Sequence, residues 1–130
     1  MCNRLNKYLK ERALSFHHAF VGIFFLIKYE KNSQVQATMA IITIIAGILF
    51  QISTTEWIVV ITFIGLVLAM EAVNSAIEKL SDYACKNQIN SNIKIVKDLA
   101  AAAVLFVSIA AFIVGVIIFA PKVYSIISSF

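Results

Sequence analysis

The feature that most constrains this chain is an uninterrupted apolar run near its C-terminus. The segment Leu99–Ala120 is 22 residues long and contains no charged side chain. A helix of about 20 apolar residues crosses the hydrocarbon core of a bilayer, which is about 30 Å thick. Of the whole chain, 61% is hydrophobic and 14% is charged, whereas soluble domains carry roughly 25% charged residues. We therefore expect one membrane-embedded domain over residues 1–130.

Two further apolar stretches favour the same kind of fold. They lie at about residues 35–52 and 57–82, and the third span is expected over about 95–120. One Pro and four Gly supply too little turn chemistry for a membrane β-barrel. The sequence therefore predicts an all-α integral membrane fold with three transmembrane helices.

Residues 3–29 are expected to form a fourth helix of a different kind. Apolar residues recur in it at helical spacing, and basic residues fall mostly between them. This pattern is typical of an amphipathic helix that lies in the membrane interface. The apolar positions are Leu5, Leu9, Ala13, Phe16, Phe20, Ile23, Phe24 and Ile27, and the basic ones are Arg4, Lys7, Lys10, Arg12 and Lys28.

Basic residues near the spans predict the orientation in the membrane. Six precede the first span, the loop Ser53–Glu56 has none, four lie between the second and third spans, and one follows the third. We therefore expect the N-terminus and the second loop in the cytoplasm, the C-terminus outside, and a bacterial plasma (inner) membrane location. Cys2 and Cys85 then face a reducing compartment as free thiols. The net charge of +4 indicates attraction to anionic lipid headgroups, not nucleic-acid binding.

Four polar side chains share one face at the inner end of the second span. At about 100° per residue, Asn74, Glu78 and Asp82 lie near −60°, −20° and +20° from Glu71. Trp57 is a plausible anchor at the outer interface. Glu71, 14 residues further on, is then about 21 Å inward, roughly 9 Å inside the cytoplasmic edge of the hydrocarbon. Glu78 lies near that edge.

These depths suggest different roles for the two glutamates. A carboxylate inside the membrane costs about 2.5–3.5 kcal/mol on insertion scales, so it needs a compensating role or partner. Glu71 is suited to act as a general base, and Glu78 is suited to bind a hard cation such as Mg²⁺. A structural alternative remains open, in which Lys94, Lys97 or a hydrogen bond from another helix neutralises the carboxylate.

Other charged residues are expected at the same membrane boundary. Glu30 ends the surface helix, and Lys97-Asp98 opens the third span on the same side. Each alone is typical of a solvated helix end or a positive-inside anchor. Together with the stripe on the second span they suit a metal–nucleotide complex, where catalysis is mainly positioning and charge neutralisation. No Walker A loop is present in the sequence.

The stripe also resembles a known family. Residues 71–82 read E-A-V-N-S-A-I-E-K-L-S-D, similar to the E-x-x-N-[ST]-A-I-E-x-x-x-D signature of the small prokaryotic diacylglycerol kinases, which include undecaprenol kinases. Glu30-Lys31-Asn32 resembles the family's E-R-N, and Lys97-Asp98 with the following alanines resembles its K-D-x-A-A-G-A. Gln36 departs from the pattern, since His or Glu is common there.

The resemblance implies a fold, an activity and a set of site residues. The family fold is a surface helix plus three transmembrane helices, assembled as a homotrimer with active sites between subunits. The implied activity is phosphorylation of a membrane lipid alcohol by ATP with Mg²⁺, with Glu71 as the catalytic base. Glu30 and Glu78 would bind the metal, and Asn32 and Glu71 the lipid substrate. The implied ATP-binding residues are Arg12, His18, Glu30, Asn74, Glu78, Asp82, Lys97 and Asp98.

Undecaprenol is the favoured substrate, and diacylglycerol is the alternative. Thr55-Glu56-Trp57 and Ile117–Lys122 resemble the undecaprenol kinase branch. A second function class is a small ion-coupled transporter that uses Glu71 and Glu78 as a proton or cation relay. A third is a structural assembly subunit, which would explain small residues such as Gly47 and Gly115 as helix-packing faces but not the acidic stripe.

Overall fold

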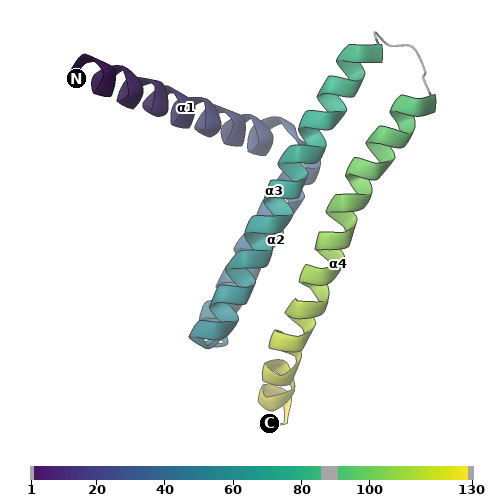
Figure 1. Ribbon diagram of the computed structural model, residues 1–130. Helices are drawn as coiled ribbons and strands as arrows, with labels where there is room; N and C mark the ends of the chain where they lie inside the picture. Colours follow the sequence, from purple (N-terminus) through teal and green to yellow (C-terminus); the bar gives the residue numbers. More distant parts are fainter. Residues whose placement is uncertain (1, 86–90, 129–130) are drawn as a thin grey trace.

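Long helices with very little chain between them make up the fold (Figure 1). The computed structural model describes residues 2–85 and 91–128. They form α1 (Cys2–Tyr29), α2 (Lys31–Leu49), α3 (Thr54–Cys85) and α4 (Ser91–Ile127). The expectation of an all-helical chain is confirmed for these residues.

Three of the helices, α2, α3 and α4, are long and apolar enough to cross a membrane. Their 19, 32 and 37 residues reach about 28, 48 and 55 Å. All three helices begin earlier than the segments expected over 35–52, 57–82 and 95–120. Helices α3 and α4 also end later than expected. Since α3 and α4 exceed the thickness of about 30 Å of the hydrocarbon, their polar ends extend into the interface.

The central helix of the arrangement is α3. It packs against both α4 and α2, whereas α2 and α4 stay apart from each other along the residues that the structure describes. Buried side chains include several polar ones, while most large apolar side chains are exposed. This distribution is the reverse of that in a soluble protein and suits a chain whose outer surface faces lipid.

Helix α1 leaves the other three at a steep angle (Figure 1). Of residues 4–29, all but Leu26 are exposed, so no other described part of the chain covers most of α1. A single extended residue, Glu30 (φ −97°, ψ 112°), separates α1 from α2. Its carbonyl oxygen accepts a hydrogen bond from the amide of Gln34. This residue redirects the chain from the direction of α1 to that of α2.

The turn between α2 and α3 explains why α2 ends at Leu49. Gln51 adopts a left-handed conformation (φ 50°), and the amides of Gln51 and Ile52 donate to the carbonyl oxygens of Ile48 and Gly47. This is a Schellman motif, which satisfies the last carbonyl groups of the helix.

The start of α3 carries a capping box. Ser53 Oγ accepts from the amide of Glu56, and Glu56 Oε2 accepts from the amide of Ser53 at 2.6 Å. The reciprocal pair satisfies two amides that a helix N-terminus leaves without partners. It places Trp57 against Gly47, where a Cβ atom would lie only 2.8 Å from Trp57 Cη2.

The end of the bundle at this turn is held by an apolar cluster and an ion pair. Buried Ile52, Val60 and Ile118 form the cluster, and Lys122 Nζ lies 3.2 Å from Glu56 Oε1. Pro121 lies inside α4, which continues to Ile127. Proline removes only one backbone donor, and membrane helices tolerate it where neighbouring groups compensate.

Candidate active site

The polar stripe of α3 lies on an unbroken helix, so its four members keep the shared face that their spacing predicts. Glu71 and Asn74 are buried, Glu78 is half-buried and Asp82 is exposed. The stripe therefore passes from a buried to an exposed environment as it approaches the C-terminal end of α3. This gradient separates a carboxylate covered by the chain from one that a ligand can reach.

Glu71 is 2% exposed, and Gln36 of α2 holds it. Gln36 Nε2 donates to Glu71 Oε2 at 3.1 Å. This is the interhelical hydrogen bond that the sequence left open as an alternative, whereas neither Lys94 nor Lys97 forms an ion pair with Glu71. One neutral amide donor satisfies a single carboxylate oxygen, so Glu71 keeps acceptor capacity for a hydroxyl group.

Asn74 lies between Glu71 and the more exposed part of the stripe. It is 4% exposed, and its Nδ2 lies 3.5 Å from Glu78 Oε1. Its Oδ1 is buried and has no hydrogen-bond partner in the described part of the chain. An unpartnered buried carbonyl oxygen next to a carboxylate is available to a donor or a cation.

Glu30 reaches α3 from the junction of α1 and α2. Its Oε1 lies 2.7 Å from Lys79 Nζ, and Lys79 follows Glu78 directly in α3. The Lys79 ammonium also lies 4.9 Å from the centre of the Phe25 ring of α1. The ion pair therefore brings Glu30 next to the stripe.

Small buried hydroxyl residues line the same region. Ser33 in the first turn of α2 is 0% exposed, and its hydroxyl has no partner among the described residues. Ser75 and Ser81 of α3 are also buried. Small residues of this kind let membrane helices approach closely, and they keep space beside the carboxylates.

The Lys-Asp pair of α4 is only partly joined to the stripe. Lys97 Nζ lies 2.9 Å from Asp82 Oδ1, so these two predicted nucleotide contacts are brought together. Asp98 is exposed on α4, and Asn32 is exposed in the first turn of α2. Residues 86–90, which connect α3 to α4, lie outside the described residues.

Arg12 and His18 are not brought to the stripe within one chain. They lie 18 and 12 residues before Glu30 on the continuous helix α1, which places them about 27 and 18 Å from it along the axis. Both are exposed. Arg12 packs over the Tyr8 ring at 5.0 Å, and His18 lies edge-on to His17.

The oxygen ligands present fit a magnesium ion that is shared with a nucleotide. Within residues 2–85 and 91–128, no three His, Cys, Asp or Glu side chains gather into a metal-binding group. Mg²⁺ is usually bound by one or two carboxylates plus substrate phosphates and water, so a larger group is not required. Glu30, Glu78 and the unpartnered Oδ1 of Asn74 supply suitable oxygen atoms.

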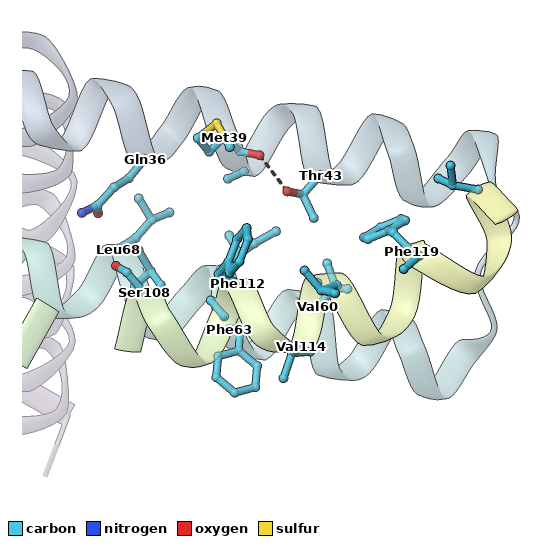
Figure 2. Close-up of a pocket in the computed structure, with 18 of the residues that line it drawn as sticks. Gln36, Met39, Thr43, Val60, Phe63, Leu68, Ser108, Phe112, Val114 and Phe119 are labelled. Carbon is cyan, nitrogen blue, oxygen red and sulfur yellow. Dashed lines mark hydrogen bonds between the residues drawn. The ribbon is translucent and has the colours of Figure 1, made fainter. Parts of the chain in front are cut away.

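An apolar groove reaches Gln36, the hydrogen-bond partner of Glu71. It has a volume of about 860 Å³ and is lined by side chains of α2, α3 and α4. Figure 2 shows Gln36 at the end of the groove near α1, Met39 and Phe112 along its sides, and Phe119 towards the opposite end. Because Gln36 also binds Glu71, the inner end of the groove lies one side chain away from the buried carboxylate.

The sequence did not indicate that Gln36 and Lys79 would lie at the site. From the sequence, Gln36 is only a departure from the family pattern, and Lys79 is only one of the basic residues expected in the cytoplasm. A polar residue in an otherwise apolar stretch was the available signal for Gln36. For Lys79 the signal was its place directly after Glu78, about 100° from it around the helix.

Comparison with known proteins identifies the family of the chain. A model of the family described as prokaryotic diacylglycerol kinase matches residues 17–119. The undecaprenol kinase of Bacillus subtilis (strain 168) is 35% identical over 120 residues, covering 92% of this chain and 94% of that protein. The diacylglycerol kinase of Synechocystis sp. is 29% identical over 113 residues, covering 87% of this chain and 65% of that protein. The chain therefore belongs to the prokaryotic diacylglycerol kinase family and is a membrane lipid kinase.

Proposed function

We propose that the chain transfers the γ-phosphoryl group of ATP to the hydroxyl group of a membrane lipid alcohol at the cytoplasmic face. The observation that carries this proposal is the buried carboxylate of Glu71 beside the inner end of an apolar groove. A lipid chain can lie in the groove while its hydroxyl group meets Glu71. The half-exposed carboxylates of Glu30 and Glu78 lie on the water-facing side.

In this proposal Glu71 is the general base. The hydroxyl oxygen forms a bond to the γ-phosphorus, the bond from that phosphorus to the bridging oxygen of ADP breaks, and the hydroxyl proton passes to Glu71. Gln36 holds one carboxylate oxygen at 3.1 Å, which leaves the other oxygen to face the hydroxyl group. Positioned proton transfer of this kind contributes typically about 10²- to 10⁴-fold to a rate.

Glu30, Asn74 and Glu78 would hold Mg²⁺ together with the nucleotide. When bound, the metal neutralises charge on the phosphates, which is the main requirement of phosphoryl transfer. Lys97 would contact phosphate from α4, and Asp82 and Asp98 would contact the nucleotide. The ion pair of Lys97 with Asp82 at 2.9 Å keeps the ammonium group at this site. Asn32 would contact the lipid headgroup.

The working unit would be a homotrimer with sites shared between subunits. The support is geometric: Arg12 and His18 lie about 27 and 18 Å from Glu30 along one helix, so a neighbouring copy whose α1 lies closer to the stripe would bring them to the same nucleotide. The exposed apolar face of α1 suits the cytoplasmic interface of the bacterial plasma membrane, with the C-terminus outside.

Undecaprenol is the favoured acceptor, with diacylglycerol as the alternative. The Bacillus relative that matches nearly the whole chain is named an undecaprenol kinase. The groove runs along much of the bundle, from Gln36 of α2 to Ile127 of α4. A groove of this length can accommodate a long lipid chain.

The test is phosphorylation of a panel of lipid alcohols. Purified protein in bicelles receives labelled ATP, Mg²⁺ and either undecaprenol, a shorter polyprenol or diacylglycerol, and lipid-bound phosphate is measured. We expect phosphorylated polyprenol. Glu71→Gln should abolish turnover while ATP binding, measured by calorimetry, stays close to that of the wild type. Retained turnover in this variant would refute the assignment of the base.

A further inference from the structure

Lys79 makes two contacts that the proposed chemistry does not use. Its Nζ lies 2.7 Å from Glu30 Oε1 and 4.9 Å from the centre of the Phe25 ring. Phe25 in turn packs against Tyr29, with ring centres 4.8 Å apart. Lys79 therefore joins α3 both to the last turns of α1 and to the residue that follows α1.

The partner of Lys79 is a side chain that forms no hydrogen bond within its own segment, although the Glu30 backbone does. Glu30 is a single extended residue between two helices, and its side chain makes no capping hydrogen bond to α2. Its carboxylate is 21% exposed. Without the ion pair, this side chain would be free to turn towards water.

The ion pair also determines where the Glu30 carboxylate lies relative to the stripe on α3. Lys79 is the residue after Glu78, so its Cα atom lies about 3.8 Å from that of Glu78. Within the described part of the chain, Lys79 is the only lysine paired with Glu30, since Lys97 pairs with Asp82 and Lys122 with Glu56. Glu30 is thus held from a different element against the residue that follows the half-buried Glu78 on α3.

We propose that Lys79 is a positioning residue that holds the Glu30 carboxylate beside Glu78, ready to bind the magnesium–triphosphate complex. The inference rests on the proposed function, because it takes Glu30 as a ligand of that complex. The Lys79 side chain is 54% exposed, so its ammonium group can leave a Glu30 oxygen when the metal arrives. Its positive charge then remains close to the phosphates.

The experiment compares Lys79→Met, Lys79→Arg and the wild type in bicelles, both by kinetics and by calorimetric titration with magnesium–ATP in the absence of a lipid alcohol, where the dissociation constant should follow the KM. Methionine keeps an unbranched apolar stem over Phe25 but removes the charge. Changes to groups that orient metal ligands typically cost about 10- to 100-fold in metal affinity or activity. We therefore expect Lys79→Met to raise the KM for magnesium–ATP about 10-fold or more with a much smaller change in kcat. Lys79→Arg should recover most of the loss.

The control is Lys94→Met, which removes a charge from an exposed lysine at the same end of the bundle. This variant should keep the wild-type KM. Lys79→Gln replaces Lys79→Met if the latter does not give a thermal unfolding transition like that of the wild type. An unchanged KM in the Lys79 variant, or a lower one because the ammonium group competes with the metal, would overturn the proposal.

Glu30→Gln separates this inference from the proposed function. If Glu30→Gln raises the KM and Lys79→Met does not, the positioning role fails while the metal assignment stands. If Glu30→Gln leaves the KM unchanged, the metal assignment itself fails. The double variant Glu30→Gln/Lys79→Met should be no worse than Glu30→Gln alone, because residues that act through one another are not additive. Additive losses would show that Lys79 acts independently of Glu30.

Discussion

Replacing Gln36 with methionine should destabilise the fold by leaving a buried carboxylate without its hydrogen bond. Gln36 Nε2 donates to Glu71 Oε2 at 3.1 Å, and Glu71 is 2% exposed. A hydrogen bond to a charged group contributes about 1.5–3 kcal/mol, and a buried group left unsatisfied carries its desolvation penalty. We therefore expect Gln36→Met to lower the free energy of unfolding by about 2 kcal/mol.

The assay is unfolding in mixed micelles, followed by the fluorescence of Trp57, the single tryptophan of the chain. Gln34→Met is the matched control, because Gln34 also donates through its side-chain amide, to the carbonyl oxygen of Lys28, but at an exposed position. Exposed substitutions usually change stability by no more than about 0.5 kcal/mol.

A second measurement isolates the charge of Glu71. In a Glu71→Gln background, Gln36→Met removes a hydrogen bond between neutral groups, which is worth only about 0.5–1.5 kcal/mol. The cost of Gln36→Met should therefore be smaller in that background. An equal cost in both backgrounds, or an equal cost for Gln34→Met, would refute the reasoning.

Two further predictions concern the metal and the packing of the turn between α2 and α3. Glu78→Gln should raise the Mg²⁺ concentration needed for half-maximal activity or abolish activity, since it removes a carboxylate ligand; an unchanged magnesium titration would count against this role. Gly47→Ala should lower the free energy of unfolding, because a Cβ atom at Gly47 would lie 2.8 Å from Trp57 Cη2 and overpacking costs about 1–3 kcal/mol. Gly65→Ala is the control: a Cβ there meets nothing within 4 Å, so this helical substitution should stabilise by about 0.5–1 kcal/mol, and equal effects at the two glycines would contradict the argument.

The helices could be predicted from sequence because each rests on a local pattern. The charge-free run Leu99–Ala120 requires a spanning helix whatever the rest of the chain does. The positions at which the helices end were harder to predict from the sequence. A glutamine in the left-handed region at Gln51 ends α2 where glycine or asparagine would have been the usual signal. Pro121, expected close to a helix end, lies inside α4.

The candidate site likewise has a part that the sequence predicted and a part that it did not. The stripe Glu71–Asp82 follows from helical periodicity, because its members lie on one helix. The pairs Gln36–Glu71 and Glu30–Lys79 join residues of different elements, and their partners depend on how α1 and α2 pack against α3. Periodicity within a segment carries no information about such packing. The sequence could therefore indicate an interhelical partner for Glu71 only as one of several alternatives.

The direction of α1 has the strongest bearing on how the site can work. A single extended residue turns the chain at Glu30, and this turn presents the Glu30 carboxylate to α3 while it directs the rest of α1 away from the bundle (Figure 1). The turn that brings Glu30, a predicted metal ligand, to α3 therefore also places Arg12 and His18 far from the stripe of the same chain. If all of these residues contact one nucleotide, α1 of another copy would bring Arg12 and His18 to it, and a monomer would keep the proposed base and metal ligands but lack part of the proposed nucleotide-binding surface.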